Sequence, residues 1–177
     1  MRKNQGAYRL LVGAWLVGTW FSGASAFAED GAAVASEVTA AQPELSKAPL
    51  VITSRDGRRS QFSVEVARRA RELEVGEMFR TSIPPDGGML FLWPRPFEAE
   101  MWMRHTLVPL DILFVGADHR IQAIAENAVP LSEAHITGRG PAAATIELAG
   151  GTTEKLGIEV GDAVSSPAMT GGMRSSE

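Results

Sequence analysis

Apolar and polar residues alternate along several short segments between residues 49 and 165, a pattern typical of β-strands with one buried face. The clearest segment is 61–67, where Phe62, Val64 and Val66 share one face and polar side chains occupy the other. Seven further strands are expected from apolar or alternating runs at residues 50–53, 89–93, 99–104, 111–115, 120–125, 145–149 and 163–164. The pattern therefore predicts a sheet made mainly of antiparallel strands.

Glycine and helix-forming residues mark the turns and two short helices between these strands. Asp56-Gly57 supplies the positive φ that a tight hairpin turn needs, and residues 116–119 are expected to form a second hairpin turn. Helix formers at 68–75 and 152–156 predict short helices, each followed by glycine. The expected fold class is mainly β (α+β): a compact antiparallel β-sheet or barrel-like domain with one or two short helices.

The first 28 residues have the layout of a secretory signal peptide. Arg2, Lys3 and Arg9 provide a positive start, an uncharged run follows from 10 to 28, and Ala26 and Ala28 form an A-x-A cleavage pattern. An uncleaved membrane anchor is the alternative, because the run is nearly long enough to span a bilayer. The shift from bulky to small residues favours cleavage after Ala28 and a periplasmic or secreted protein.

Composition divides the rest of the chain into three parts. Residues 29–48 are rich in Ala, Glu, Ser and Pro without an aromatic residue, which predicts a flexible linker. Residues 49–165 carry the strand pattern and are expected to form the single domain. Residues 166–177 are small and polar and are expected to be a disordered tail.

Charge and cysteine content narrow the possible partners. The 177 residues include 17 basic and 21 acidic side chains, and signal cleavage removes three basic residues, which leaves a net charge of −7. An acidic protein is a poor nucleic-acid binder, so no nucleic-acid partner is expected. The absence of cysteine excludes disulfides, thiol catalysis and a lipid anchor on cysteine. Membrane contact is expected only through the signal peptide, if it stays uncleaved.

Short motifs in a fixed order across about a hundred residues resemble a known family. They are Val64-Glu65-Val66-Ala67, Gly76-Glu77-Met78-Phe79-Arg80, Gly88-Met89-Leu90-Phe91, Trp102-Met103-Arg104-His105-Thr106, Pro109-Leu110-Asp111-Ile112-Leu113-Phe114, Ile146-Glu147-Leu148-Ala149-Gly150, Gly157-Ile158 and Gly161-Asp162-Ala163-Val164. Together they resemble domain of unknown function 192. The resemblance implies a compact, mainly β fold with one or two short helices, often in exported bacterial and archaeal proteins, and no established activity.

The chain departs from that family's pattern at three positions. Glu77 stands where the family usually has an apolar residue, and Arg104-His105 replaces the commoner Lys-Asn pair. Arginine keeps the positive charge in a planar fork, and histidine changes the donors and acceptors and titrates near neutral pH. The role of that asparagine in the family therefore does not transfer to His105.

No familiar catalytic or metal-binding motif is present in the sequence. The nucleophile elbow, the phosphate-binding glycine loops and the H-E-x-x-H motif are all absent. His105, His119 and His135 do not have metal-ligand spacing with acidic neighbours. We therefore expect no metal ion and no cofactor.

The stretch from Trp102 to Asp111 is the best candidate for a site. In a strand from Met101 onward, Trp102 and Arg104 would share one face, and an aromatic ring beside a guanidinium can hold a planar or anionic group. Asp111 opens an apolar strand, so a buried partner is expected, with Arg80 or Arg104 as candidates. Glu147, in another apolar strand, faces the same choice between a structural pair and a ligand site. The candidate ligand-binding residues are Arg80, Trp102, Arg104, His105, Thr106, Asp111 and Glu147.

Three functions remain open from the sequence. The first is a non-catalytic periplasmic binding or accessory module for a small molecule or an envelope component, with its site around Trp102, Arg104 and Asp111. The second is a hydrolase or lyase that pairs Asp111 or Glu147 with His105 for proton transfer. The third is a structural protein of the cell envelope, with no ligand site.

Overall fold

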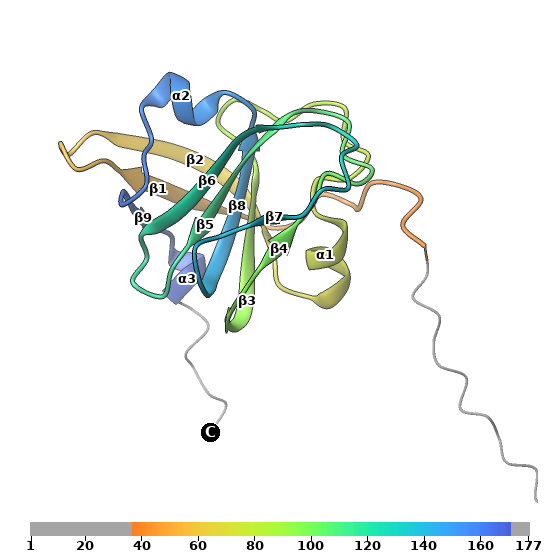
Figure 1. Cartoon of the computed structure of the whole chain (residues 1–177), viewed down its shortest axis with the longest axis horizontal. Coiled ribbons are helices and arrows are strands. Elements are labelled where there is room, and N and C mark those ends of the chain that lie inside the picture. The colour runs from red at the N-terminus through yellow and green to blue at the C-terminus, as the bar shows by residue number, and fades with distance from the viewer. Residues whose placement is uncertain (1–36, 171–177) are drawn as a thin grey trace, which may run out of the picture. The chain divides into compact units, whose positions relative to one another are not determined.

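The computed structural model describes residues 37–170, which form a mainly β unit (Figure 1). The strands are β1 (Lys47–Thr53), β2 (Arg59–Ala67), β3 (Met89–Phe97), β4 (Glu100–Met101), β5 (Leu110–Val115), β6 (Ile121–Ala128), β7 (Ile136–Thr137), β8 (Ala142–Ala149) and β9 (Ala163–Ser165). The helices are α1 (Ala70–Val75), α2 (Thr152–Leu156) and α3 (Pro167–Thr170). The predicted fold class and the two predicted helices are confirmed, and α3 is an additional short helix.

Seven strands form one curled sheet in the order β6-β5-β8-β3-β2-β1-β9, and β4 pairs with β7 in a separate two-stranded sheet. The two edges of the large sheet meet at one end. Arg120, next to β6, forms an isolated bridge with Ala163 of β9. Beside it, the Gly161 N–H donates to the Ile121 carbonyl at 2.8 Å. These contacts give the sheet the barrel-like curl that the sequence predicts.

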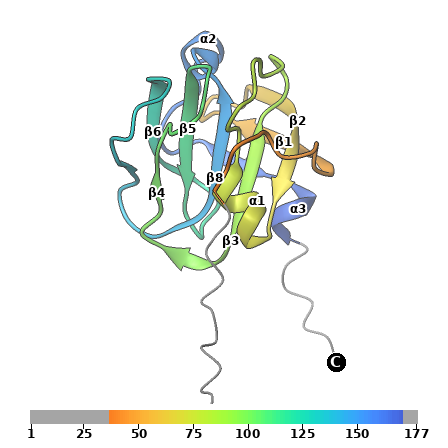
Figure 2. The ribbon, with the colours of Figure 1, turned by 90° about the vertical axis from the view of Figure 1, so that its right-hand side faces the viewer.

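One pair of neighbouring strands is parallel, whereas the other pairs in the large sheet are antiparallel. β2 and β3 run parallel, with Glu65 opposite Met89 and Ala67 opposite Phe91. The connection between them contains α1, as parallel pairing requires a crossover. Figure 2 shows α1 beside the strands that it connects, and α2 at one end of the sheet. The first turn of α1 is closed by Glu72, whose Oε2 accepts the backbone N–H groups of Arg68 and Arg69 at 2.9 Å.

The apolar residues form two main clusters on opposite faces of the curled sheet. The inner cluster includes Leu50, Val64 and Ile146, and the outer cluster includes Met89, Phe91 and Phe114. All six residues of β5 are buried, because its side chains alternate between the two clusters. The predicted burial of Met101 and Met103 is confirmed, since both belong to the outer cluster. The sheet is therefore covered on both faces, and a polar side chain on the outer face is shielded from water.

Residues 37–48, expected to belong to a flexible linker, contact the domain instead. Val38 packs with Val75 and Met78 in a third apolar cluster. The Gln42 side chain donates to the Gly76 carbonyl at 2.9 Å, and β1 already begins at Lys47. This segment has no aromatic residue, but Val38, Gln42 and Leu45 give it specific anchors.

The C-terminal boundary also differs from the prediction, since residues 167–170 form α3 rather than part of a disordered tail. The signal peptide, the residues from 29 to 36 and the tail beyond 170 lie outside the described residues. Within residues 37–170, no helix is long and apolar enough to span a membrane.

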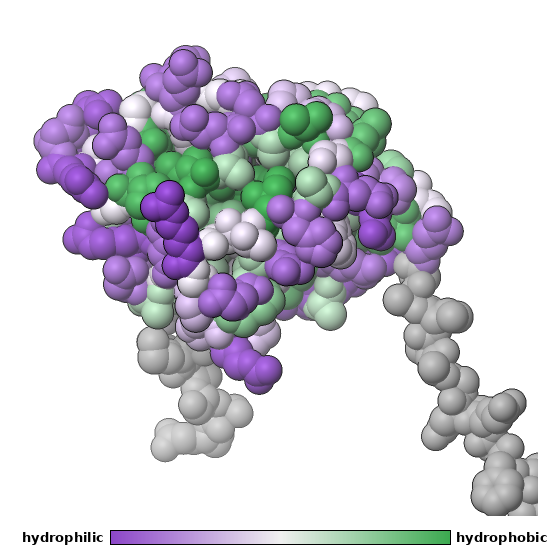
Figure 3. All heavy atoms as spheres, in the orientation of Figure 1, coloured by the Kyte–Doolittle hydropathy of each residue, from purple (hydrophilic) through white to green (hydrophobic). Residues whose placement is uncertain are grey.

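Hydrophobic and hydrophilic residues are interspersed on the face of the molecule shown in Figure 3. Six large apolar side chains of the described unit are exposed: Phe97, Trp102, Leu107, Val129, Leu131 and Val160.

Candidate functional site

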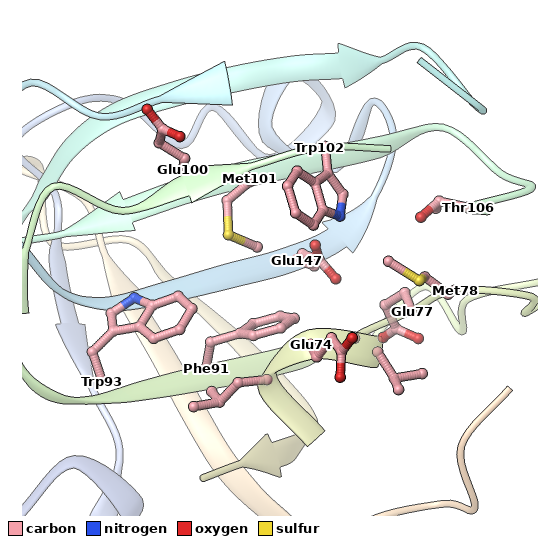
Figure 4. Close-up of a pocket in the computed structure, with 13 residues that line it drawn as sticks. Glu74, Glu77, Met78, Phe91, Trp93, Glu100, Met101, Trp102, Thr106 and Glu147 are labelled. Carbon is pink, nitrogen blue, oxygen red and sulfur yellow. The ribbon is translucent and has the colours of Figure 1, made fainter. Parts of the chain in front are cut away.

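A small cavity of about 70 Å³ lies on the outer face of the sheet, where α1 and the turn after it meet β3, β8 and the segment that follows β4 (Figure 4). Its four ionisable lining residues are all glutamates: Glu74, Glu77, Glu100 and Glu147. The other lining residues are Leu73, Val75, Gly76, Met78, Phe91, Trp93, Met101, Trp102 and Thr106. We call this cavity the acid-lined pocket.

Strand alternation places Glu147 on the outer face of β8. Its neighbours Ile146 and Leu148 belong to the inner cluster, so the side chain between them points to the opposite face. Met89 of β3 lies opposite Glu147 and also opposite Glu65 of β2. Two buried carboxyl groups therefore flank one methionine on the same face of the sheet.

Arg80 holds the carboxyl group at one end of this row. Its Nη1 and Nη2 donate to Oε1 and Oε2 of Glu65 at 2.7 and 2.8 Å. Its Nε lies 2.9 Å from Oε2 of Glu77, but the two groups are not aligned for a hydrogen bond. One guanidinium thus contacts two buried carboxyl groups. It makes two hydrogen bonds to Glu65 and an ion pair without a hydrogen bond to Glu77.

Glu147 has an unsatisfied oxygen although it is almost wholly buried. Its exposed fraction is 4%, and its Oε2 has no hydrogen-bond partner. The Glu77 backbone N–H acts on this carboxyl group by lowering its pKa, against the larger effect of burial. In the view of Figure 4 the Glu147 carboxyl group lies between the labelled Trp102 ring and the Glu77 side chain. A buried oxygen without a hydrogen bond destabilises the folded protein. A ligand that donates a hydrogen bond could therefore bind at this point on the pocket wall.

Burial makes weak acids of the Glu77 and Glu147 carboxyl groups, which we call the two inner carboxyl groups of the pocket. It raises the pKa of Glu77 from 4.5 to about 7, even though the Arg80 charge acts in the opposite direction and Glu65 adds to the rise. Burial raises the pKa of Glu147 from 4.5 to about 8, and the charge of Glu77 contributes to the rise. Both groups therefore exchange protons near neutral pH, which is unusual for glutamate.

The rim of the pocket combines an aromatic ring with two exposed carboxylates. Trp102 is 36% exposed, and the Arg104 guanidinium lies over its ring at 4.8 Å from the centroid. Glu74 and Glu100 are about half exposed, at 44% and 56% of their side chains. Glu74 pairs with Arg71 at 3.1 Å, and the Glu100 carboxylate lies 3.0 Å from His135 Nδ1.

Among the residues expected from sequence, the structure brings three into the pocket: Trp102, Thr106 and Glu147. Arg80 lies behind the pocket wall, in contact with Glu77. Arg104 does lie beside Trp102, because its guanidinium stacks on the indole from outside the pocket. The strand expected at residues 99–104 is wrong, however, since β4 ends at Met101 and Arg104 lies in a turn. The predicted residues thus divide between the pocket and its surroundings.

Asp111 does not pair with an arginine, which corrects the expectation from sequence. Its Oδ1 accepts the backbone N–H groups of Asn127 at 2.8 Å and Gly151 at 3.0 Å. Its Oδ2 accepts the N–H and the hydroxyl of Thr153, both at 2.8 Å. Four donors satisfy this buried carboxylate, so it fixes the start of α2 and does not line the pocket.

His105 also lies away from the carboxyl groups with which it was hypothesised to act. It has a positive φ of 57°, and its ring stacks on Phe79 with centroids 4.9 Å apart. The Phe79 backbone N–H donates to the His105 carbonyl at 2.8 Å. The segment before Arg80 is thereby tied to the segment after Trp102, and the imidazole is not among the groups lining the acid-lined pocket.

Sequence reasoning did not select Glu77 and Glu65 as site residues. Glu77 carried a signal, since an acid stands where the similar family has an apolar residue. Glu65 gave none, because it occupies a polar position in an alternating strand. Among the described residues, no group of three or more His, Cys, Asp or Glu side chains could hold a metal ion.

Comparison with known proteins adds a family and two solved structures. Residues 51–166 match the DUF192 family model, described as Uncharacterized ACR. A structure from Sinorhizobium meliloti 1021, provisionally described as a transcription regulator, is 38% identical over 71% of this chain and 97% of its own, with a TM-score of 0.68. A protein of unknown function from Novosphingobium aromaticivorans DSM 12444 is 42% identical over 73% of this chain and 94% of its own, with a TM-score of 0.67. Curated proteins give no significant match.

Proposed function

Since the chain belongs to the DUF192 family, whose function is unknown, we propose from its geometry that it is a non-catalytic, exported binding module whose ligand enters the acid-lined pocket. The observation that carries this proposal is the Glu147 Oε2 atom, which is buried on the pocket wall without a hydrogen-bond partner. A ligand that donates a hydrogen bond to this atom would remove the penalty of leaving it unsatisfied.

The shape of the pocket supports binding of a small group. Ligand sites that enclose a whole drug-sized molecule have volumes of about 300 Å³ or more. The acid-lined pocket has about 70 Å³, enough for a few heavy atoms. The ligand would therefore insert one end, while the partly exposed Trp102 contacts the portion that remains outside.

Export is the cellular part of the proposal and rests on the sequence of residues 1–28. The positive start, the uncharged run and the Ala26-x-Ala28 pattern support secretion to the periplasm or beyond. The intact mass of protein recovered from the periplasmic fraction tests it, with residues 29–177 expected. A full-length mass in the membrane fraction would show an uncleaved anchor instead.

Two other functions have weaker support. A carboxylate–histidine acid–base pair needs the groups within hydrogen-bond reach, but Asp111 is engaged by Thr153 and His105 stacks on Phe79. A transcription-regulating role would need a basic surface for DNA phosphates, whereas the chain has 21 acidic and 17 basic residues.

A fragment screen followed by two-dimensional NMR tests the binding function. The indole N–H resonances of Trp93 and Trp102 report on the pocket, which both residues line, and single Trp→Phe variants assign them. We expect at least one small polar fragment to shift these resonances saturably. A diverse screen that leaves both indoles unchanged would rule out the pocket as a binding site.

A further inference from the structure

The lining of the acid-lined pocket has a single sign of charge, which restricts what it can bind. Its four ionisable residues are glutamates, and it has no basic lining residue. Arg80 contacts Glu77 from behind, but its guanidinium is already engaged by both oxygens of Glu65. Any anionic ligand would meet carboxylates and no free cation on the pocket wall.

We propose that the acid-lined pocket binds the primary ammonium group of an organic amine, which donates hydrogen bonds to Glu147 and Glu77 while its alkyl chain lies along Trp102. This inference rests on the proposed binding function and names its ligand class. The ammonium supplies a donor to the unpaired Glu147 Oε2. It also supplies a positive charge to the two inner carboxyl groups.

Hydrogen-bond chemistry selects a primary ammonium over other cations. It carries three N–H donors, whereas a quaternary ammonium has none and would leave Glu147 Oε2 unsatisfied. A cation is also attracted to the face of an aromatic ring, and Phe91, Trp93 and Trp102 line the pocket. A bare metal ion is a poorer fit, because the described side chains form no metal-binding group of three ligands.

Binding an ammonium should release protons from the pocket. Both carboxyl groups retain protons near neutral pH, because burial raises the pKa of Glu147 to about 8 and that of Glu77 to about 7. A cation favours the ionised form of each group, so it lowers both pKa values and drives protons into solution. Affinity should therefore increase as the pH rises towards about 8.

Other charged groups near the pocket set the background for this pH dependence. Glu65 of β2 is paired with Arg80 behind the pocket. At the rim, α1 contributes Glu74 with Arg71, and β4 contributes Glu100, next to His135. The Arg104 guanidinium lies over the Trp102 ring and adds a positive charge beside the rim, so Arg104→Met is a required comparison in the pH series.

Isothermal titration calorimetry with butylamine tests the inference directly. Butanol, butyrate and butyltrimethylammonium share its alkyl chain but lack the charge, reverse it or remove the donors. Repeating the titration in two buffers of different ionisation enthalpy measures the protons released. We expect butylamine to bind at least tenfold more tightly than the other three, with net proton release at pH 7.

Glu147→Gln is the diagnostic variant, because it removes the ionisable group with little change of shape. We expect it to weaken butylamine binding at least tenfold and to reduce the number of protons released, while circular dichroism confirms that the variant is folded. Glu98→Gln makes the same substitution at an exposed residue outside the pocket lining and should bind like the wild type. If Glu147→Gln fails to fold, proton release by the wild type still decides the question.

The outcomes separate this inference from the binding function on which it rests. If butanol or butyrate binds in the pocket and butylamine does not, the ammonium assignment is wrong and the binding function stands. Butylamine binding without proton release, or binding that Glu147→Gln leaves unchanged, also overturns the assignment. If no fragment of any class shifts the Trp93 and Trp102 indole resonances, both proposals are wrong.

Discussion

Thr153 donates both its backbone N–H and its hydroxyl to the same oxygen of Asp111, each at 2.8 Å. The other oxygen of Asp111 accepts the N–H groups of Asn127 and Gly151. A carboxylate in β5 therefore organises the start of α2, about forty residues further along the chain. Its partners come from three different positions on the backbone, and no charge opposite to its own is required.

We predict that Asp111→Asn lowers the free energy of unfolding by about 2 to 4 kcal/mol, because an amide turns one acceptor into a donor that faces N–H groups. Urea denaturation measures the change. Asp118→Asn is the matched control, since Asp118 is exposed and its Oδ1 accepts one hydrogen bond, from Arg120 N–H at 3.1 Å. Equal stability losses in the two variants would contradict the organising role of Asp111.

Arg80 is expected to be essential to stability because it compensates the charge of Glu65 and contacts Glu77. Arg80→Met should lower the free energy of unfolding by roughly 3 to 5 kcal/mol, as removal of one partner from a buried ion pair does. The loss should be smaller below a pH of about 7, where protonation of Glu77 removes one of the charges that Arg80 compensates. Arg80→Lys should recover only part of it, because an ammonium cannot make the two-pronged contact seen with Glu65.

Arg104→Met provides the control for this experiment. Arg104 is about half exposed, and its pair with Glu133 is long, at 3.5 Å. Its replacement should change the free energy of unfolding by less than about 1 kcal/mol. A loss for Arg80→Met as small as that for Arg104→Met would contradict the role assigned to Arg80.

Because of the two inner carboxyl groups, we predict that the free energy of unfolding falls as the pH rises. Burial raises the pKa of Glu147 to about 8 and of Glu77 to about 7, from an ordinary value of 4.5. Between pH 4.5 and the raised pKa of each group, the unfolded chain has lost a proton that the folded chain keeps. Each increase in pH within this range therefore reduces the free energy of unfolding. Glu72 has the opposite sign, since backbone N–H groups lower its pKa, and its contribution changes only below about 4.5.

Urea denaturation at several pH values between about 5 and 8 measures this slope. Glu147→Gln cannot ionise, so its stability should fall less steeply over this range, with the difference from wild type greatest near pH 8. The variant should be more stable than the wild type there. Glu98→Gln should keep the wild-type slope, because Glu98 is exposed. Parallel slopes in wild type and Glu147→Gln would contradict the raised pKa.

Gly88 is predicted to tolerate no side chain. It has a φ of +140°, and a Cβ at this position would lie 2.2 Å from the backbone oxygen of Glu147. Gly57 also has a positive φ, +86°, but a Cβ there would have nothing within 4 Å. Gly57→Ala should therefore cost only the backbone strain, roughly 1 to 3 kcal/mol, and Gly88→Ala should cost more than that or prevent folding. Thermal melting compares the two variants, and Gly88→Ala should have the lower melting temperature.

Strands with one exposed face, such as β2, could be predicted from sequence because their burial alternates with a period close to two. Phe62 and Val64 are buried in the inner cluster, as their alternation with polar residues predicts. The parallel pairing of β2 and β3 could also have been inferred, since a helix between two strands is typical of a crossover. The order of the sheet could not, because it depends on contacts between segments far apart in the chain.

The candidate site was predicted only in part, for a physical reason. Trp102 and Glu147 stood out because an aromatic residue and an acid occupied unusual positions in apolar segments. The partners of Asp111 could not be identified, because backbone N–H groups are present at nearly every residue and leave no mark in a sequence. The packing of residues 37–48 was missed for a similar reason, since Val38 and Gln42 act as single contacts that composition does not reveal.

The pairing of β1 with β9 has a consequence for how the protein forms. Ile52 lies opposite Val164, so the first and last strands of the sheet are neighbours although most of the domain separates them in the chain. Such distant pairings are typical of domains that fold over milliseconds to seconds. During synthesis the sheet can close only after the segment containing Val164 has left the ribosome. Until then the free edge of β1 is open to other chains, and a chaperone that delays collapse would protect it.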